Sequence, residues 1–329
     1  MTEPEIPPPA APEAAPPPTP PPPTEEPSPP LEEAPLMELA PADRSFRGGG
    51  LRMPIGAAVA WSCGTILVFW SLAGAVATYR NDLITLFACE AIALLGGAAL
   101  VWLLYGRASA PPIGRPLESP LPPRERALDF FALRPAHPGI YPLSVLLGLA
   151  IHIPVEVIFR SIEQRWPGPA QDLARSFLEA GTAKKIAIGS ILVVIGPLVE
   201  EIFFRGALFR PLRKTSSAPM TIAVTSVMFA ISHFAPHTYV PIALVGVALG
   251  IARHASGSLL PPFLLHAAFN GLSLLAMATT PLDAADRPSP PLWVTLAGTA
   301  VTVGLAAWLW VIGARARAPD ELSNEPARR

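Results

Sequence analysis

Long apolar blocks separated by short polar segments make up most of the chain beyond residue 50. Blocks of about 18 or more apolar residues are typical of transmembrane helices. The pattern predicts eight spans, near 54–78, 83–105, 139–159, 186–208, 218–235, 238–252, 259–279 and 291–314. The sixth block is the shortest and the weakest of the eight. The sequence therefore predicts an all-α, polytopic membrane protein with about eight transmembrane helices.

The first fifty residues follow a different pattern. They hold 17 of the 43 prolines, and nine acidic residues against two arginines. A segment without an apolar face and with this much proline and charge is expected to be disordered, partly in polyproline II conformation. A solvated spacer is the simpler interpretation of this Pro/Glu-rich tail. A docking segment for a proline-binding partner is the alternative.

The basic residues beside the spans predict the orientation of the chain in a cell membrane. Nearly all of them fall on one side when both termini are placed in the cytoplasm, as the excess of Lys and Arg in cytoplasmic loops requires. They are Arg44, Arg47, Arg52, Arg107, Arg115, Arg124, Arg126, Arg134, Arg210, Arg213, Lys214, Arg253, Arg315 and Arg317. Lys184 and Lys185 oppose this orientation but are outnumbered.

Composition agrees with a membrane protein and excludes some functions. Hydrophobic residues make up 51% of the chain and charged residues 15%, whereas about a quarter of the residues of a soluble domain are charged. The formal net charge of -1 gives no support to nucleic-acid binding. Cys63 and Cys89 both lie in apolar blocks, so we expect small buried side chains rather than a disulfide or metal ligands.

Two adjacent carboxylates interrupt the fourth apolar block, in "VVIGPLVEEIFFRGALFR". Ionisable residues inside a span are functional candidates, because they must be paired or line a wet cavity. On a helix Glu201 and Arg205 share a face and can pair, while Glu200 points about 100° away. An unpaired carboxylate in an apolar setting suits a general base near neutral pH. A purely structural ion-pair cluster is the alternative.

Two later spans carry further polar side chains at helical spacing. Phe229 and His233 lie four residues apart on the fifth span, and His266 and Asn270 lie four apart on the seventh. Two hydrogen-bond donors on one face could hold a developing oxyanion. The alternative for each group is a hydrogen bond between helices. Straight helices, rising 1.5 Å per residue, do not readily bring all three groups to one depth. Either the helices are tilted or broken, or the predicted span boundaries are misplaced by several residues.

The ordered set of three motifs resembles the type II CAAX prenyl endopeptidases and the related CPBP (Abi) intramembrane peptidases. The motifs are "EEIFFR" at 200–205, "FAISH" at 229–233 and "HAAFN" at 266–270. The resemblance covers roughly 185–285. It implies an endopeptidase acting on a membrane-associated protein or peptide, one class being lipid-anchored proteins. The bilayer is the other implied partner.

The resemblance also implies roles for individual residues. Glu200 would activate water, His233 would help to hold it, and His266 and Asn270 would stabilise the oxyanion. The supporting residues would be Glu201, Arg205 and Phe229. The sequence as a whole predicts a tail at 1–50, N-terminal helices with a cytoplasmic loop at 51–160, a helical core at 185–285, and a last helix with a cytoplasmic tail at 286–329. The resemblance covers only the core, and it implies that this core is catalytic.

A metal ion is the main alternative for the chemistry. Zinc favours three protein ligands plus water, and Glu200, His233 and His266 would be that set. No HExxH helix is present, and these ligands would come from three separate spans. We therefore favour glutamate-activated water without a metal or other cofactor, with a divalent metal such as zinc as the alternative.

The sequence contains other polar residues inside spans and is compatible with other functions. His152 and Glu156 lie four apart beside Pro154, in a kinked helix where they either pack or line the same cavity. Glu90 on the second span is a weaker candidate. A non-catalytic scaffold or bacteriocin-immunity-type protein is the alternative function. A proton-coupled transporter would show paired half-helices in both halves of the chain, and the sequence has no such symmetry.

Overall fold

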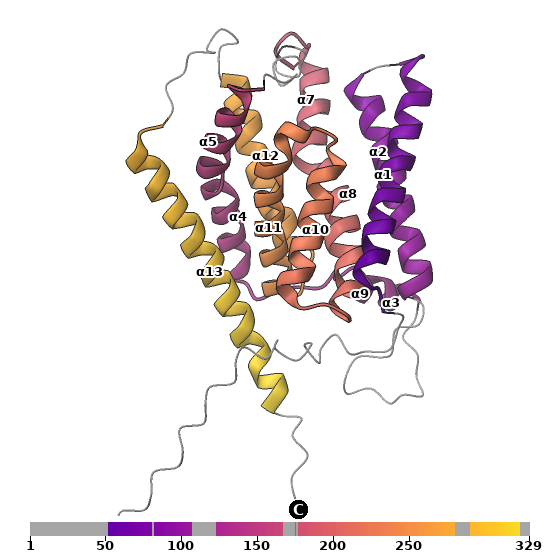
Figure 1. The fold of residues 1–329 in the computed structure, drawn as a ribbon, viewed down its shortest axis with the longest axis vertical. Coiled ribbons are helices and arrows are strands. Elements are labelled where there is room, and N and C mark those ends of the chain that lie inside the picture. The colour runs from indigo at the N-terminus through magenta and orange to yellow at the C-terminus, as the bar shows by residue number, and fades with distance from the viewer. Residues whose placement is uncertain are drawn as a thin grey trace, which may run out of the picture. The chain divides into compact units, whose positions relative to one another are not determined.

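The computed structural model of the protein describes residues 52–80, 82–106, 123–166, 175, 177–279 and 290–322. The predicted disordered tail at 1–50 lies outside these residues. The described residues form helices and no strand, which confirms the all-α prediction (Figure 1).

The N-terminal helices are α1 (Ile55–Ala77), α2 (Leu83–Val101) with the π-helical segment η2 (Trp102–Gly106), α3 (Pro123–Phe130), α4 (Ile140–Ala150) and α5 (His152–Glu163). One long span follows, made of α7 (Thr182–Ser190), η3 (Ile191–Ile195), α8 (Gly196–Glu201), η4 (Ile202–Leu208) and α9 (Phe209–Arg213). The last helices are α10 (Ala218–Ser232), α11 (Tyr239–Ser256) after a 3₁₀ turn at Pro236–Thr238, α12 (Leu260–Thr279) and α13 (Leu292–Leu322).

Seven helical stretches in the described part of the chain are long and apolar enough to cross a membrane, and α10 is a shorter apolar helix beside them. The prediction of about eight spans is therefore confirmed, as seven long helical stretches and one shorter apolar helix. The weakest block was misjudged, because α11 runs for 18 residues whereas α10 has only 15. The predicted end of the sixth span at residue 252 was four residues too early, since the buried Arg253 and His254 still belong to α11.

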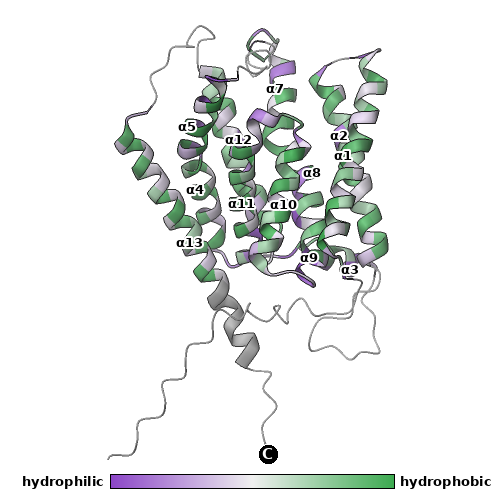
Figure 2. Cartoon of the chain, in the orientation of Figure 1, coloured by the Kyte–Doolittle hydropathy of each residue, from purple (hydrophilic) through white to green (hydrophobic). Residues whose placement is uncertain are grey.

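Most of the length of the helices is coloured as hydrophobic (Figure 2), and many of the large apolar side chains are exposed. Leu67 on α1, Leu275 on α12 and Trp293 on α13 are among the large exposed hydrophobic residues. Apolar surface of this extent is stable in lipid rather than in water. Cys63 is also exposed whereas Cys89 is buried, and both are free thiols, so the expectation of two buried cysteines was wrong for Cys63.

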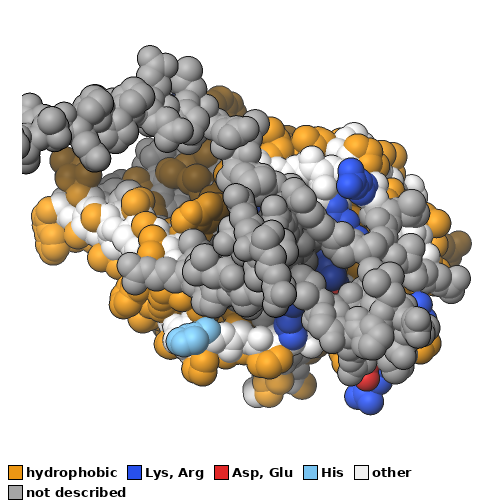
Figure 3. Space-filling model, turned by 90° about the horizontal axis from the view of Figure 1, so that it is seen from below, with side chains coloured by type: hydrophobic (Ala, Val, Ile, Leu, Met, Phe, Trp, Pro, Cys, Tyr) orange, Lys and Arg blue, Asp and Glu red, His pale blue; other side chains and the backbone are white. Residues whose placement is uncertain are grey.

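Charged side chains gather at the ends of the bundle. Figure 3 views the end where α3 and α9 lie, and most of the charged side chains visible there are Lys or Arg. Lys184 and Lys185 lie in the first turns of α7, at the opposite end (Figure 1).

Prolines break two of the spans. Pro154 cannot donate to Ala150, and the third span is interrupted at Ile151 between α4 and α5. In the fourth span the π-helical segment η3 ends two residues before Pro197, and η4 ends three residues before Pro211. These breaks rotate the following side chains relative to a regular helix.

Glycines allow α10 and α11 to approach closely. A Cβ added to Gly246 would lie 2.9 Å from the Ser226 Cβ, and one added to Gly250 would lie 2.8 Å from the Ile222 Cγ2. This is the small-xxx-small spacing that lets membrane helices pack backbone to backbone. Gly246 also offers its carbonyl oxygen to the buried Arg205 on the fourth span.

Candidate active site

The site begins with a completely buried ion pair at the junction of α8 and η4. Arg205 Nη1 donates to Glu201 Oε1 at 2.9 Å, and both side chains are 0% exposed. Arg205 Nη2 donates to the carbonyl oxygen of Gly246 on α11 at 3.0 Å. The predicted pairing of Glu201 with Arg205 is therefore present. The Gly246 carbonyl group was not foreseen, although the GxxxG spacing of Gly246 and Gly250 marks a close helix contact.

Phe229 connects the ion pair to both histidines. The Arg205 guanidinium carbon lies 4.7 Å from the centre of the Phe229 ring, a cation–π distance. The same ring contacts the imidazoles of His233 and His266 edge to face, with centroid distances of 5.0 and 5.6 Å. Phe229 is 1% exposed, so its position is fixed by packing. It holds three polar side chains from three helices in one arrangement.

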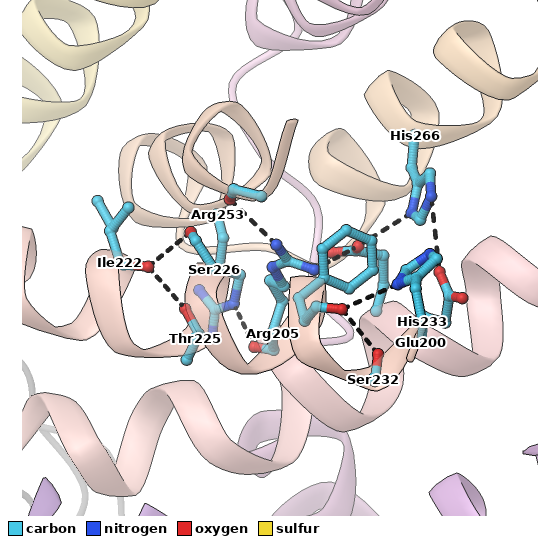
Figure 4. Close-up of polar contacts among 12 residues, drawn as sticks. Glu200, Arg205, Ile222, Thr225, Ser226, Ser232, His233, Arg253 and His266 are labelled. Atoms are coloured by element: carbon cyan, nitrogen blue, oxygen red, sulfur yellow. Dashed lines mark hydrogen bonds and ion pairs between the residues drawn. The ribbon is translucent and has the colours of Figure 1, made fainter. Parts of the chain in front are cut away.

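His266 on α12 lies close to both adjacent carboxylates, and Figure 4 shows it beside Glu200. Its Nδ1 lies 3.2 Å from Glu201 Oε1, and its Nε2 lies 3.6 Å from Glu200 Oε2. Glu201 Oε1 already accepts from Arg205, so it is an acceptor toward His266 as well, and Nδ1 donates to it. A carboxylate that orients a histidine in this way recurs in hydrolytic active sites. This orientation points Nε2 toward Glu200.

His233 ends α10 and has a defined tautomer. Its Nδ1 lies 2.9 Å from the carbonyl oxygen of Phe229, and a carbonyl group only accepts, so Nδ1 carries the hydrogen. Nε2 of the neutral ring is then an acceptor. Phe234 follows with φ 50°, a strained conformation for a bulky residue, and its ring contacts Trp70 of α1 at 4.9 Å. This turn stops the helix and fixes His233 at its end.

The short α10 and the breaks in the fourth span explain how side chains of the three motifs come to lie at a similar depth in the bundle. Straight helices did not bring the motifs to one level, yet the ring of Phe229 contacts His266, and His266 lies beside Glu200 and Glu201. Of the two explanations, broken helices are confirmed at η3 and η4. Glu200 keeps 12% of its side chain exposed while Glu201 has none, so Glu200 is the more accessible carboxylate.

Asn270 lies one turn beyond His266 and bonds to the backbone of the fourth span. Its Nδ2 donates to the carbonyl oxygen of Leu192 at 2.8 Å. In the π-helical segment the Gly196 amide donates to Ile191, so the next carbonyl, that of Leu192, would need the amide of Pro197, which has no hydrogen. Asn270 supplies the missing donor. One of its two amide hydrogens therefore holds helices together, as one of the two sequence interpretations expected.

Glu90 on α2 is brought against Glu200, at the contact between α2 and α8. From sequence Glu90 is only a weak candidate. The signal is its charge inside an apolar span, which already marks a functional candidate. Glu200 could not be predicted as its partner, because the two residues are on different helices and are 110 positions apart.

His152 and Glu156 on α5 do not join the site. Glu156 Oε1 accepts from Arg160 Nε at 2.6 Å, a pair whose side chains are 36% and 26% exposed. His152 Nε2 lies 3.1 Å from Ser273 Oγ on α12, and its ring contacts Phe269. These contacts favour the packing interpretation over a role in the site.

The described side chains offer no ready metal centre. No three His, Cys, Asp or Glu residues among the described ones are placed to hold a metal ion. Both ring nitrogens of His266 face carboxylates, and Nδ1 of His233 is bonded to a carbonyl oxygen. The arrangement of Glu200, His233 and His266 thus does not fit the three-ligand set considered from sequence, and no step through a metal can be written from it.

Residues 182–272 match the family model described as Type II CAAX prenyl endopeptidase Rce1-like. The match begins at the first residue of α7 and ends within α12, so it includes all three motifs and excludes Glu90. It supports the relation to the CAAX and CPBP proteins that the motifs indicated. Comparisons with curated proteins and with solved structures gave no match.

Proposed function

We propose that this protein is an intramembrane endopeptidase that hydrolyses a peptide bond of a membrane-associated protein, lipid-anchored proteins being one such class. The family match supports protease activity of the CAAX type. The observation that carries the proposal is the chain of contacts from Arg205 through Glu201 and His266 to Glu200. It is the arrangement of an orienting carboxylate, an imidazole and an accessible carboxylate that general acid–base hydrolysis uses.

In the proposed reaction Glu200 takes a proton from a water molecule while the water oxygen attacks the scissile carbonyl carbon. His233 accepts a hydrogen bond from the same water through Nε2, which fixes its position. The tetrahedral intermediate then breaks its C–N bond, and Glu200 returns the proton to the leaving amine. The new C–O bond and the transferred proton account for both products, a carboxylic acid and an amine.

The oxyanion of the intermediate needs hydrogen-bond donors. His266 donates from Nε2 when it is protonated, and Asn270 has a second amide hydrogen that Leu192 does not use. Glu201 would hold the ring of His266 in place, because it accepts a hydrogen bond from Nδ1. Arg205 in turn holds Glu201 through their ion pair. Each supporting residue therefore acts through His266 rather than on the substrate.

The first test compares protein termini in membranes that carry the wild type or Glu200→Ala at matched protein levels. We expect particular membrane proteins to gain new termini only with the wild type, which also identifies the substrate. The matched control is Glu156→Gln, which removes a carboxylate of the half-exposed pair with Arg160 and should leave the termini unchanged. Identical profiles for wild type and Glu200→Ala would favour a scaffold or immunity-type protein instead.

A chelation experiment separates the two forms of the chemistry. Cleavage by the purified protein should persist after exhaustive dialysis against a strong zinc chelator. Loss of cleavage that zinc restores would show that a metal takes part and would overturn the metal-free mechanism. The measurement must use the same substrate termini found in the first test.

We also propose that both termini face the cytoplasm. The Lys and Arg side chains at the end of the bundle with α3 and α9 (Figure 3) support this orientation. It is tested with single cysteines placed between residues 106 and 123 and at position 184, in a variant whose two native cysteines are replaced by serine. An impermeant thiol reagent added to intact cells should label only position 184.

A further inference from the structure

The carboxyl group of Glu90 faces that of Glu200 across the contact between α2 and α8, outside the family match. Nothing in the three motifs assigns a role to α2. The two helices nevertheless pack against each other both before and after the two glutamates along the chain. These packing contacts define the register of one helix against the other.

Along α2, Phe87 lies before Glu90 and Gly97 lies after it, and both face the fourth span. A Cβ added to Gly196 would lie 3.7 Å from Phe87 Cε2, and one added to Gly97 would lie 3.0 Å from Phe203 Cε2. Along both helices the residue numbers increase in the same direction, so α2 and α8 run parallel. Glu90 lies one turn after Phe87, and Glu200 lies one turn after Gly196. The register therefore brings these two carboxyl groups together.

The chemistry of the pair follows from the position of two carboxyl groups side by side in an apolar setting. Two negative charges so placed repel each other strongly, so the pair is stable when it holds one proton between its members. The charged groups facing Glu200 from neighbouring elements are Glu90 on α2, His266 on α12, and Glu201 and Arg205 on its own span. Arg205 is already paired with Glu201, so none of the described residues supplies a cation dedicated to Glu90 and Glu200.

We propose that Glu90 is a positioning residue that holds Glu200 through a shared proton and aims its second oxygen at His266 and the reacting water. This role rests on the proposed endopeptidase function. Glu90 touches neither substrate nor water. It restricts the rotation of the Glu200 carboxyl group, and the shared proton keeps two negative charges from facing each other in an apolar setting.

The kinetic test compares Glu90→Gln with Glu90→Leu, using the cleavage product identified in the termini comparison. Gln keeps both a donor and an acceptor at the same place, so its kcat should stay within about threefold of wild type. Leu removes the hydrogen bond, so kcat should fall by about tenfold or more with KM unchanged. Unchanged kcat in Glu90→Leu, or equal losses of kcat in both variants, would overturn the proposal.

A second measurement does not depend on activity or on a Leu variant that folds. Infrared spectra of the purified full chain should show the carbonyl stretch of a protonated carboxyl group. That band should shift or disappear both in Glu90→Gln and in Glu200→Gln, and it should be unchanged in Glu156→Gln. A band unchanged in Glu90→Gln would show that Glu90 holds no part of this proton.

The two proposals fail in different ways. Loss of cleavage in Glu200→Ala combined with normal kcat in Glu90→Leu would overturn the role of Glu90 alone. Unchanged termini in Glu200→Ala would overturn the endopeptidase, and the infrared band would then still decide whether the carboxyl pair exists.

Discussion

Asn270 donates to the carbonyl oxygen of Leu192 at 2.8 Å, across the contact between α12 and the fourth span. The bond exists because Pro197 has no amide hydrogen to offer that carbonyl group. This hydrogen bond connects a side chain of the third motif to the span that carries Glu200. The distance between Glu200, the proposed base, and His266 and Asn270, the proposed oxyanion donors, therefore depends on it.

This relationship predicts a coupling between Asn270 and Pro197. Asn270→Ala should lower the free energy of unfolding by about 1–3 kcal/mol, because the Leu192 carbonyl group loses its partner. In a Pro197→Ala background the new backbone amide can bond within the helix, so the same change should cost less. The measurement is a double-mutant cycle on denaturant unfolding in detergent micelles. Equal costs in both backgrounds would show that the missing amide of Pro197 does not create the need for Asn270.

The buried ion pair predicts a large loss of stability when one partner is removed. Arg205→Met leaves Glu201 buried and without its cation, and it should destabilise the protein by about 3–5 kcal/mol. The matched control is Arg160→Met, which breaks a pair of the same i, i+4 spacing that is partly exposed, and it should cost about 1 kcal/mol or less. The double variant Glu201→Leu/Arg205→Met should recover most of the loss. Comparable unfolding midpoints for Arg205→Met and Arg160→Met would contradict the buried environment.

The contact between α10 and α11 predicts a difference between glycines. Gly250→Val would place side-chain atoms in the space of Ile222, and such overpacking costs about 1–3 kcal/mol. Gly64 on α1 has nothing within 4 Å of an added Cβ, so Gly64→Ala should be neutral or slightly stabilising. Thermal unfolding followed by tryptophan fluorescence gives both values. Cleavage should fall only in Gly250→Val, because α10 carries Phe229 and His233, and a loss of cleavage in Gly64→Ala would contradict this explanation.

The parts of the structure that could be predicted from sequence are those that depend on one helix at a time. Length and apolar content were enough for the spans, and the i, i+4 spacing was enough for the pairing of Glu201 with Arg205. The same spacing does not predict the bond of Asn270, which reaches the carbonyl oxygen of Leu192 on the fourth span. Partners on other helices could not be predicted, as Glu90 with Glu200 shows. Their pairing depends on helix depth and rotation.

Depth and rotation were changed by local features that a hydropathy pattern does not contain. The π-helical segments before Pro197 and Pro211 shift the side chains that follow them. The positive φ of Phe234 ends α10 early. The prolines were visible in the sequence, but the choice between a kink and a π-helical segment is made by the packing around them.

His233 gives the most direct test of how the site would hold water. Asn at position 233 can still donate to the Phe229 carbonyl oxygen from the place of Nδ1, but it has no group at the place of Nε2. His233→Asn should therefore unfold like the wild type while its kcat falls by about 10²–10⁴-fold, the usual range for a general acid–base partner. His137→Asn, which changes an exposed histidine that accepts only from the Gly139 amide, should leave kcat unchanged. If His233→Asn cleaves at the wild-type rate, the hydrogen bond from Nδ1 is the whole contribution of this histidine, and the water must be held by Glu200 and His266 alone.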